Sequence, residues 1–141
     1  TAVEAAAVLR HCTDAGIATS VNIMCGFPGE TERDFSLTLE FIARCRDHIT
    51  WVNPADSFTG IVPGTRLHRE HKRFGVRFVG SLTFWETADG TNPFLVRMER
   101  FERLLRHLRD LGIASHYPGI EYRNRAAWIE AFHANRAAAP I

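Results

Sequence analysis

Neither sign of charge dominates this chain, because 17 Lys and Arg residues are balanced by 16 Asp and Glu residues. Without a clear net charge, a protein has no overall field that would attract nucleic acid or an anionic membrane. Long apolar runs are also missing, since no stretch reaches the roughly 18 apolar residues of a membrane-spanning helix. We therefore expect neither a nucleic-acid partner nor a membrane partner.

Cysteines are few, and their spacing suits neither a disulfide framework nor a metal-binding hairpin. Cys12, Cys25 and Cys45 are odd in number and lie far apart in the sequence. The first residues lack the basic-then-apolar order of a signal peptide, so we expect a cytoplasmic location. These residues also lack Met and begin directly in a helical pattern, and we expect the chain to be a piece of a longer polypeptide.

Three motifs that would identify an enzyme class directly are absent. Residues 26–33 have neither the spacing nor the lysine of a phosphate-binding P-loop. Gly26 and Gly29 do not complete the Gly-x-Gly-x-x-Gly pattern of dinucleotide-binding folds. The Gly-x-Ser-x-Gly elbow of α/β hydrolases is missing as well, so a hydrolase ranks last among the enzyme classes considered.

The first part of the chain has the sequence signals of alternating helices and strands. Residues 2–15 are rich in alanine and are followed by Gly16, which predicts a helix and its end. Residues 17–25 are apolar enough to predict a strand buried on both faces of a parallel sheet. Residues 49–58 predict a second strand, and this succession implies parallel strands joined by crossover helices.

The helix between these strands is predicted from both its start and its apolar stripe. Thr31 is a candidate N-cap, and Asp34 occupies the capping-box position as a shorter substitute for Glu. A stripe of buried residues then follows at helical spacing: Phe35, Leu39 and Ile42.

The second half of the chain is predicted to be mostly helical. Thr65 is a candidate N-cap of a short basic helix that ends at Gly75. Residues 76–93 predict strand fragments and loop, and Gly112 ends the longest predicted helix. The apolar stripe of that helix consists of Phe94, Met98, Phe101, Leu105 and Leu108. A terminal helix is predicted within residues 123–137, with Trp128, Ile129 and Phe132 facing inward.

The segment Asn-Ile-Met-Cys-Gly-Phe-Pro-Gly-Glu-Thr, residues 22–31, joins the first predicted strand to the helix that follows it. At the carboxyl end of a parallel strand, such a turn faces the ligand side of an α/β protein. A glycine there lets a flat ring approach closely, and the helix start supplies free N–H groups. The alternative is that Gly26 to Gly29 simply form a tight connection between strand and helix.

Two segments carry a resemblance to a known family. Residues 16–42 resemble the fifth strand and following helix of radical S-adenosylmethionine (SAM) enzymes, particularly the cobalamin-associated branch, in which a strand ends in Gly-Leu/Phe-Pro-Gly-Glu-Thr. Residues 58–68 are similar to the segment after the sixth strand of that family, with its Pro-Gly-Thr and apolar residue. Trp85, Asn92 and the helix around residues 97–101 are similar to that branch's extension beyond the barrel.

The resemblance implies that the first strand and its turn line the adenosine site for SAM. Met24 stands where the family has an aliphatic residue packed on adenine, and its polarizable sulfur suits that contact. The residues that would shape the turn are Gly26, Phe27, Pro28 and Gly29. Glu30 would touch the edge of the nucleoside or only favour the helix N-terminus. Thr59 and Ile61 would approach the same adenine.

The chain departs from the family in one decisive respect. The family motif Cys-x-x-x-Cys-x-x-Cys, which holds a [4Fe–4S] cluster, does not occur among the three cysteines. Without that cluster no electron is available to cleave SAM, so we expect the chain to be inactive alone. The cluster ligands, and any cobalamin domain, would lie outside this chain, in the preceding part of the same polypeptide.

The resemblance therefore implies an α/β fold: the C-terminal part of a partial (β/α) TIM-like barrel with parallel strands, plus a helical C-terminal extension. Residues 1–75 would supply the barrel units and residues 76–141 the extension. The intact enzyme would form a 5′-deoxyadenosyl radical that abstracts hydrogen from a small-molecule substrate. If a cobalamin domain precedes the barrel, we expect methyl transfer; other radical rearrangements and sulfur insertions use the same core. The alternative from another class is a small non-catalytic α/β binding or interaction module.

Several further side chains have both a structural and a functional interpretation. Cys25 suggests a metal ligand or a resolving thiol, but a buried strand cysteine is the commoner case. His68 and His71 lie one helical turn apart, yet without a third ligand we expect a solvated basic face. Arginines recur every third residue over 97–109, and we expect a solvated surface rather than an RNA groove. Trp85 would either face substrate or belong to the core, and we expect the core.

Overall fold

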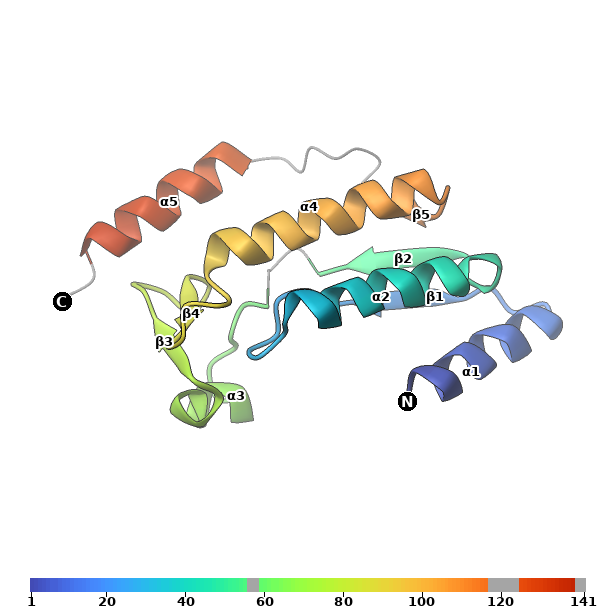
Figure 1. The fold of residues 1–141 in the computed structure, drawn as a ribbon, viewed down its shortest axis with the longest axis horizontal. Coiled ribbons are helices and arrows are strands. Elements are labelled where there is room, and N and C mark those ends of the chain that lie inside the picture. Colours follow the sequence, from blue (N-terminus) through green and yellow to red (C-terminus); the bar gives the residue numbers. More distant parts are fainter. Residues whose placement is uncertain (56–58, 117–124, 139–141) are drawn as a thin grey trace.

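The computed structural model describes residues 1–55, 59–116 and 125–138, arranged as in Figure 1. The elements in chain order are α1 (Ala2–Asp14), β1 (Ser20–Ile23), α2 (Glu32–Arg44), the 3-10 helix η1 (Arg46–His48), β2 (Trp51–Pro54), α3 (Arg66–Arg69), the 3-10 helix η2 (His71–Phe74), β3 (Val76–Phe78), β4 (Trp85–Thr87), α4 (Phe94–Asp110), β5 (Ala114–Ser115) and α5 (Arg125–Ala138). Residues 56–58, at the end of the second predicted strand, lie outside the described residues.

A parallel sheet with strand order β1-β2-β5 organises the first half of the molecule. Ser20 pairs with Trp51 and Ile23 with Pro54, so β1 and β2 run parallel in continuous register. The α/β class and the parallel strands are therefore confirmed. The described residues form no closed barrel, and beside the parallel sheet stands a separate antiparallel pair of β3 and β4.

Local signals in the sequence account for the helix boundaries. Thr31 accepts a hydrogen bond from the backbone N–H of Asp34, and the Asp34 carboxylate accepts one from the backbone N–H of Thr31, which completes the predicted capping box of α2. Thr65 caps α3 in the same way through the N–H of His68. Gly75 ends η2 in the left-handed conformation, with φ of 65°, as its position predicted.

Only one face of the parallel sheet is covered by helices in the described part of the chain. Val52 is fully buried and Val21 is half-buried, and both belong to the cluster that includes Phe35 and Ile42 of α2. The prediction of a strand buried on both faces, extending over residues 17–25, was wrong. The physical reason lies in the alternation of polar and apolar side chains within β1, which is typical of a half-buried strand.

Helix α4 links the second half of the chain to the sheet. Its predicted stripe is buried as a whole: Phe94, Met98, Phe101, Leu105 and Leu108. After Gly112 the chain enters β5, a short strand that the sequence did not predict and that pairs with β2. One core cluster joins Leu104, Leu108 and Ile113 to residues of α1, α2 and β2, so the core continues past residue 75. The boundary at that residue stays a prediction.

A second core cluster lies where α4, α5 and the β3–β4 region meet. Phe84, Phe94 and Phe132 pack in this cluster with ring centroids 4.8 to 5.9 Å apart. Trp128 and Ile129 are half-buried against it, so the inward face predicted for the terminal helix is confirmed for its described part. In Figure 1, α5 runs beside the first half of α4.

Candidate functional site

The candidate site is the turn at the carboxyl end of β1, which we call the β1 turn (residues 24–30). Two of its apolar side chains point into solvent, since Met24 is 55% exposed and Phe27 is 45% exposed. Gly26 and Pro28 are buried, and Gly26 and Gly29 have φ of +82° and +88°. The turn therefore presents an apolar edge to solvent on a backbone that only glycine adopts without strain.

The buried side of the β1 turn is filled by the side chain of Arg97 from α4. A Cβ atom at Gly26 would lie 2.4 Å from Cδ and 2.5 Å from Cγ of Arg97. The glycine thus permits the close approach of Arg97 rather than of a flat ring, which corrects the interpretation of Gly26 given by the sequence. A ligand therefore cannot approach Gly26 from the side that Arg97 occupies.

Side chains at the start of α4 hold the turn by hydrogen bonds. The Asn92 amide donates to the carbonyl oxygens of Gly26 at 3.2 Å and of Phe27 at 3.0 Å. Asn92 is fully buried, so these bonds are shielded from water. In Figure 1 the turn before α2 lies close to the start of α4 and to the β3–β4 pair.

Glu30 completes the attachment with a buried ion pair. Its Oε2 accepts from the Gly26 N–H at 2.8 Å and from the guanidinium of Arg100 at 2.9 Å. The Glu30 and Arg100 side chains are only 11% and 5% exposed. These contacts give Glu30 a structural role beyond the two that were considered, because the carboxylate ties the turn to α4. Its contact with the edge of the nucleoside stays a prediction.

Arg97 is fully buried and serves as a structural cation. Its guanidinium donates to the carbonyl oxygens of Trp85 (2.7 Å), Asn92 (3.0 Å) and Thr83 (2.8 Å). Its Cζ lies 3.7 Å from the centroid of the Trp85 ring. Burial lowers the pKa of Arg97 to about 9, because the interior disfavours the charged form.

The prediction that the arginines of α4 form a solvated surface was therefore wrong for two of them. Arg97 and Arg100 are 0% and 4% exposed, whereas the Arg109 side chain is 56% exposed. A recurrence every three residues carries successive arginines around the helix, so some of them face inward. The sequence offered no signal that backbone carbonyls and a carboxylate would meet the inward pair.

Thr59 and Ile61 occupy different environments. The Thr59 hydroxyl donates to the carbonyl oxygen of Cys25 at 2.5 Å, and the Thr59 carbonyl accepts from the Trp85 indole at 2.8 Å. These two hydrogen bonds place Thr59 against the β1 turn. The backbone of Thr59 itself has a φ of +58°. Ile61 is 3% exposed and packs with Val76 and Trp85. Trp85 itself is fully buried, so its predicted place in the core is confirmed.

The cysteines and histidines do not assemble a metal site. Within residues 1–55, 59–116 and 125–138, no three His, Cys, Asp or Glu side chains are placed to hold a metal ion. Cys25 is 2% exposed, and burial raises the pKa of its thiol to about 12. His68 and His71 are half-buried beside Phe78 rather than fully solvated. The described residues therefore do not fit the ligand set of a [4Fe–4S] cluster.

A partly polar surface on the uncovered side of the sheet was not predicted from the sequence. We call it the open face (Ser20, Asn22, Met24, Trp51, Asn53 and Ala114). Asn53 donates to the Asn22 side-chain oxygen at 3.1 Å across the two strands. Trp51 packs edge-on against His116 with ring centroids 4.9 Å apart. Polar residues at every second position of β1 were the available signal.

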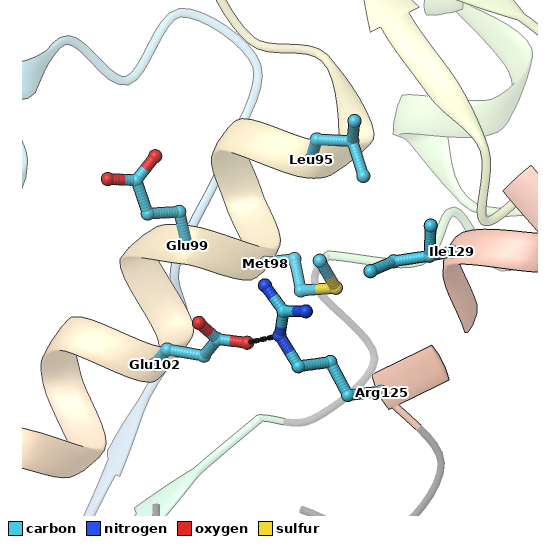
Figure 2. Close-up of a pocket in the computed structure, with 6 residues that line it drawn as sticks. All are labelled: Leu95, Met98, Glu99, Glu102, Arg125 and Ile129. Carbon is cyan, nitrogen blue, oxygen red and sulfur yellow. Dashed lines mark hydrogen bonds and ion pairs between the residues drawn. The ribbon is translucent and has the colours of Figure 1, made fainter. Parts of the chain in front are cut away.

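A separate cavity of about 300 Å³ lies between α4 and α5, as Figure 2 shows. Leu95, Met98 and Ile129 form its apolar part. Glu102 closes one side through an ion pair with Arg125 at 2.6 Å. None of the residues predicted for the adenosine site lines this cavity.

Comparisons of the chain with protein-family models, curated proteins and solved structures found no match. In the described ranges, no helix combines the length and the apolar character needed to cross a membrane. The assignment of a function therefore depends on the motifs and on the geometry of the β1 turn.

The buried Glu30 predicts a specific pH dependence of stability. Burial raises its pKa above the ordinary 4.5, and this effect outweighs the hydrogen bond from Gly26 and the attraction of Arg100. The native state then binds more protons than the unfolded state between the two pKa values, so its stability falls as pH rises through that window. Glu30→Gln is expected to lose less stability over the window, as measured by urea unfolding at successive pH values. Parallel curves for the two proteins would contradict the assignment.

Proposed function

We propose that the chain is the C-terminal part of a radical SAM enzyme and that its β1 turn contacts the adenosine part of SAM. The observation that carries the proposal is the exposed apolar edge of Met24 and Phe27 on a turn that α4 holds in place. An apolar side chain that is exposed on a fixed backbone is suited to pack against a flat nucleobase. Both residues belong to the motif that resembles the family.

The one-sided sheet supports the assignment to a larger barrel. Parallel sheets occur almost only where both faces are covered, whereas here the open face has no helix on it in the described part of the chain. In a complete (β/α) barrel the inner faces of the strands turn toward one another. The open face would then line the barrel interior, with the N-terminal half of the same polypeptide supplying the missing strands.

The chain's own residues would bind and orient SAM, while the electron would come from elsewhere. Cys25 and Cys45 are each 2% exposed within the core and do not form a three-cysteine ligand set with Cys12. The ligands of the [4Fe–4S] cluster would lie outside this chain. Bound SAM, after one-electron reduction, supplies a 5′-deoxyadenosyl radical that abstracts hydrogen from a small-molecule substrate. A preceding cobalamin domain would direct the outcome toward methyl transfer.

The proposal is tested on the intact enzyme with Met24→Asp and a matched control. Met24 and Leu37 are similarly exposed, at 55% and 51%, but Leu37 lies on α2 away from the turn. A carboxylate facing adenine would be desolvated without a partner, so Met24→Asp is expected to weaken SAM binding by about tenfold or more. Leu37→Asp is expected to bind SAM as the wild type does. The measurements are SAM affinity and 5′-deoxyadenosine release after anaerobic reconstitution with iron and sulfide.

Two results would overturn the proposal. The first is a wild-type protein that assembles no cluster and releases no 5′-deoxyadenosine. The second is a Met24→Asp variant that keeps its cluster and binds SAM like the wild type. Either result would favour the alternative, a non-catalytic α/β module in which the β1 turn is only a tight connection.

A further inference from the structure

A second cavity, of about 350 Å³, lies between α1 and the end of α2. We call it the α1 cavity, and the residues used below are Val3, Ala7, Arg10, Arg44 and His48. Arg44, at the end of α2, and His48, at the end of η1, lie in the part of the chain that leads into the start of β2, whereas the β1 turn follows the carboxyl end of a parallel strand. The α1 cavity is therefore at the opposite end of the sheet from the proposed SAM site. Figure 1 shows α1 toward the end of α2 that is remote from the turn.

The charged groups around the α1 cavity are all basic. Arg10 and Arg44 are exposed, and neither lies within ion-pair distance of a carboxylate in the described ranges. Arg46, which is not among the lining residues, instead donates to the Leu111 carbonyl at 2.6 Å. His48 also lines the cavity, and its buried Nδ1 has no hydrogen-bond partner. The Cζ of Arg44 lies 5.8 Å from the centroid of the Phe41 ring, which leaves its N–H groups without a carboxylate partner among the described residues, as at Arg10. Guanidinium groups without a carboxylate beside one cavity favour an anionic ligand.

Apart from Arg10, the wall contributed by α1 is apolar. Val3, Ala7 and Arg10 lie on one face of the helix because they are spaced by four and three residues. Val3 is 77% exposed, which leaves an aliphatic side chain in solvent beside the two arginines. Basic residues in a last helical turn also complement the helix dipole, which accounts for Arg44. The dipole does not account for the exposed valine.

We propose that the α1 cavity binds a small amphipathic anion. Its carboxylate or phosphate head would accept hydrogen bonds from Arg10 and Arg44, and its apolar part would lie against Val3 and Ala7. The volume is at the low end of the range of roughly 300–1,000 Å³ for ligand pockets, which suits a short acyl or alkyl chain. This site is distinct from the proposed SAM site, so its ligand binds without SAM or the cluster.

The test is an NMR titration of the 141-residue chain with hexanoate, hexyl phosphate, hexylamine and inorganic phosphate. Hexanoate or hexyl phosphate is expected to change the chemical shifts of the backbone amides of α1 and of the end of α2. The ligand that binds more tightly identifies the preferred head group. Hexylamine and inorganic phosphate are expected to bind at least about tenfold more weakly, since one has the wrong charge and the other no apolar part.

Substitutions of arginine residues test whether the anion binds in the α1 cavity. The double substitution Arg10→Gln with Arg44→Gln is expected to weaken binding of the anion by about tenfold or more, because each charge-assisted hydrogen bond contributes that much. Arg33→Gln, at an exposed arginine near the start of α2, is the matched control and is expected to bind as the wild type does. Circular dichroism verifies that the variants fold. Equal binding of hexylamine, or equal weakening by Arg33→Gln, would overturn the proposal, as would the absence of any shift with either anion.

Discussion

Gly26→Ala is expected to lower the free energy of unfolding by about 3 kcal/mol. The added Cβ would lie 2.4 to 2.9 Å from three carbon atoms of the Arg97 side chain. Those atoms cannot move aside easily, because the guanidinium beyond them is bonded to three carbonyl oxygens. The φ of +82° adds the strain that any non-glycine residue has there.

Gly29→Ala separates the two contributions. Gly29 has φ of +88°, but no atom lies within 4 Å of a Cβ built on it. In this variant the free energy of unfolding is expected to fall by only about 1 kcal/mol, which is the cost of the left-handed conformation. Urea unfolding of both variants at one pH makes the comparison. Equal losses would show that contact with Arg97 does not constrain Gly26.

Arg97→Met is expected to destabilise the chain by about 3–5 kcal/mol. The change keeps most of the apolar stem but removes the donors for three carbonyl oxygens, those of Thr83, Trp85 and Asn92. It also removes the cation that lies 3.7 Å from the Trp85 ring centroid. Carbonyl groups left without donors in the interior lose their hydration and gain nothing in return.

Arg109→Met is the matched control on the same helix. The Arg109 side chain is 56% exposed and, among the described residues, forms an ion pair with its neighbour Asp110 at 3.4 Å. Such surface substitutions usually change stability by less than about 0.5 kcal/mol. Urea unfolding of both variants compares the two positions. A loss at Arg97 as small as that at Arg109 would contradict the structural role of the buried guanidinium.

These two predictions also bear on the proposed site. Arg97 packs against Gly26, and Asn92 bonds the carbonyls of Gly26 and Phe27. The β1 turn is thus positioned by residues about 66 to 71 positions later in the chain. Substitutions at Asn92 would therefore affect the proposed SAM site through the turn rather than by contact with the ligand.

The sequence by itself determined the class of fold and most of its elements. Capping residues such as Thr31 and Thr65, and helix-ending glycines such as Gly75, act through contacts within a few residues. The stripe of α4 is equally local, because its period alone predicts which side chains face the core. The β1 turn could be selected as the candidate site for the same reason, from its position between a strand and a capped helix.

The tertiary structure alone decided what surrounds that turn. Burial of Arg97 and Arg100 depends on acceptors from the β3–β4 region and from Glu30, which are distant in the sequence. The strand β5 is too short to have a pattern of its own and exists because α4 returns the chain to β2. The open face depends on which helices cover the sheet. Local patterns record the preferences of neighbouring residues, whereas these features arise from long-range pairing, which one sequence does not reveal.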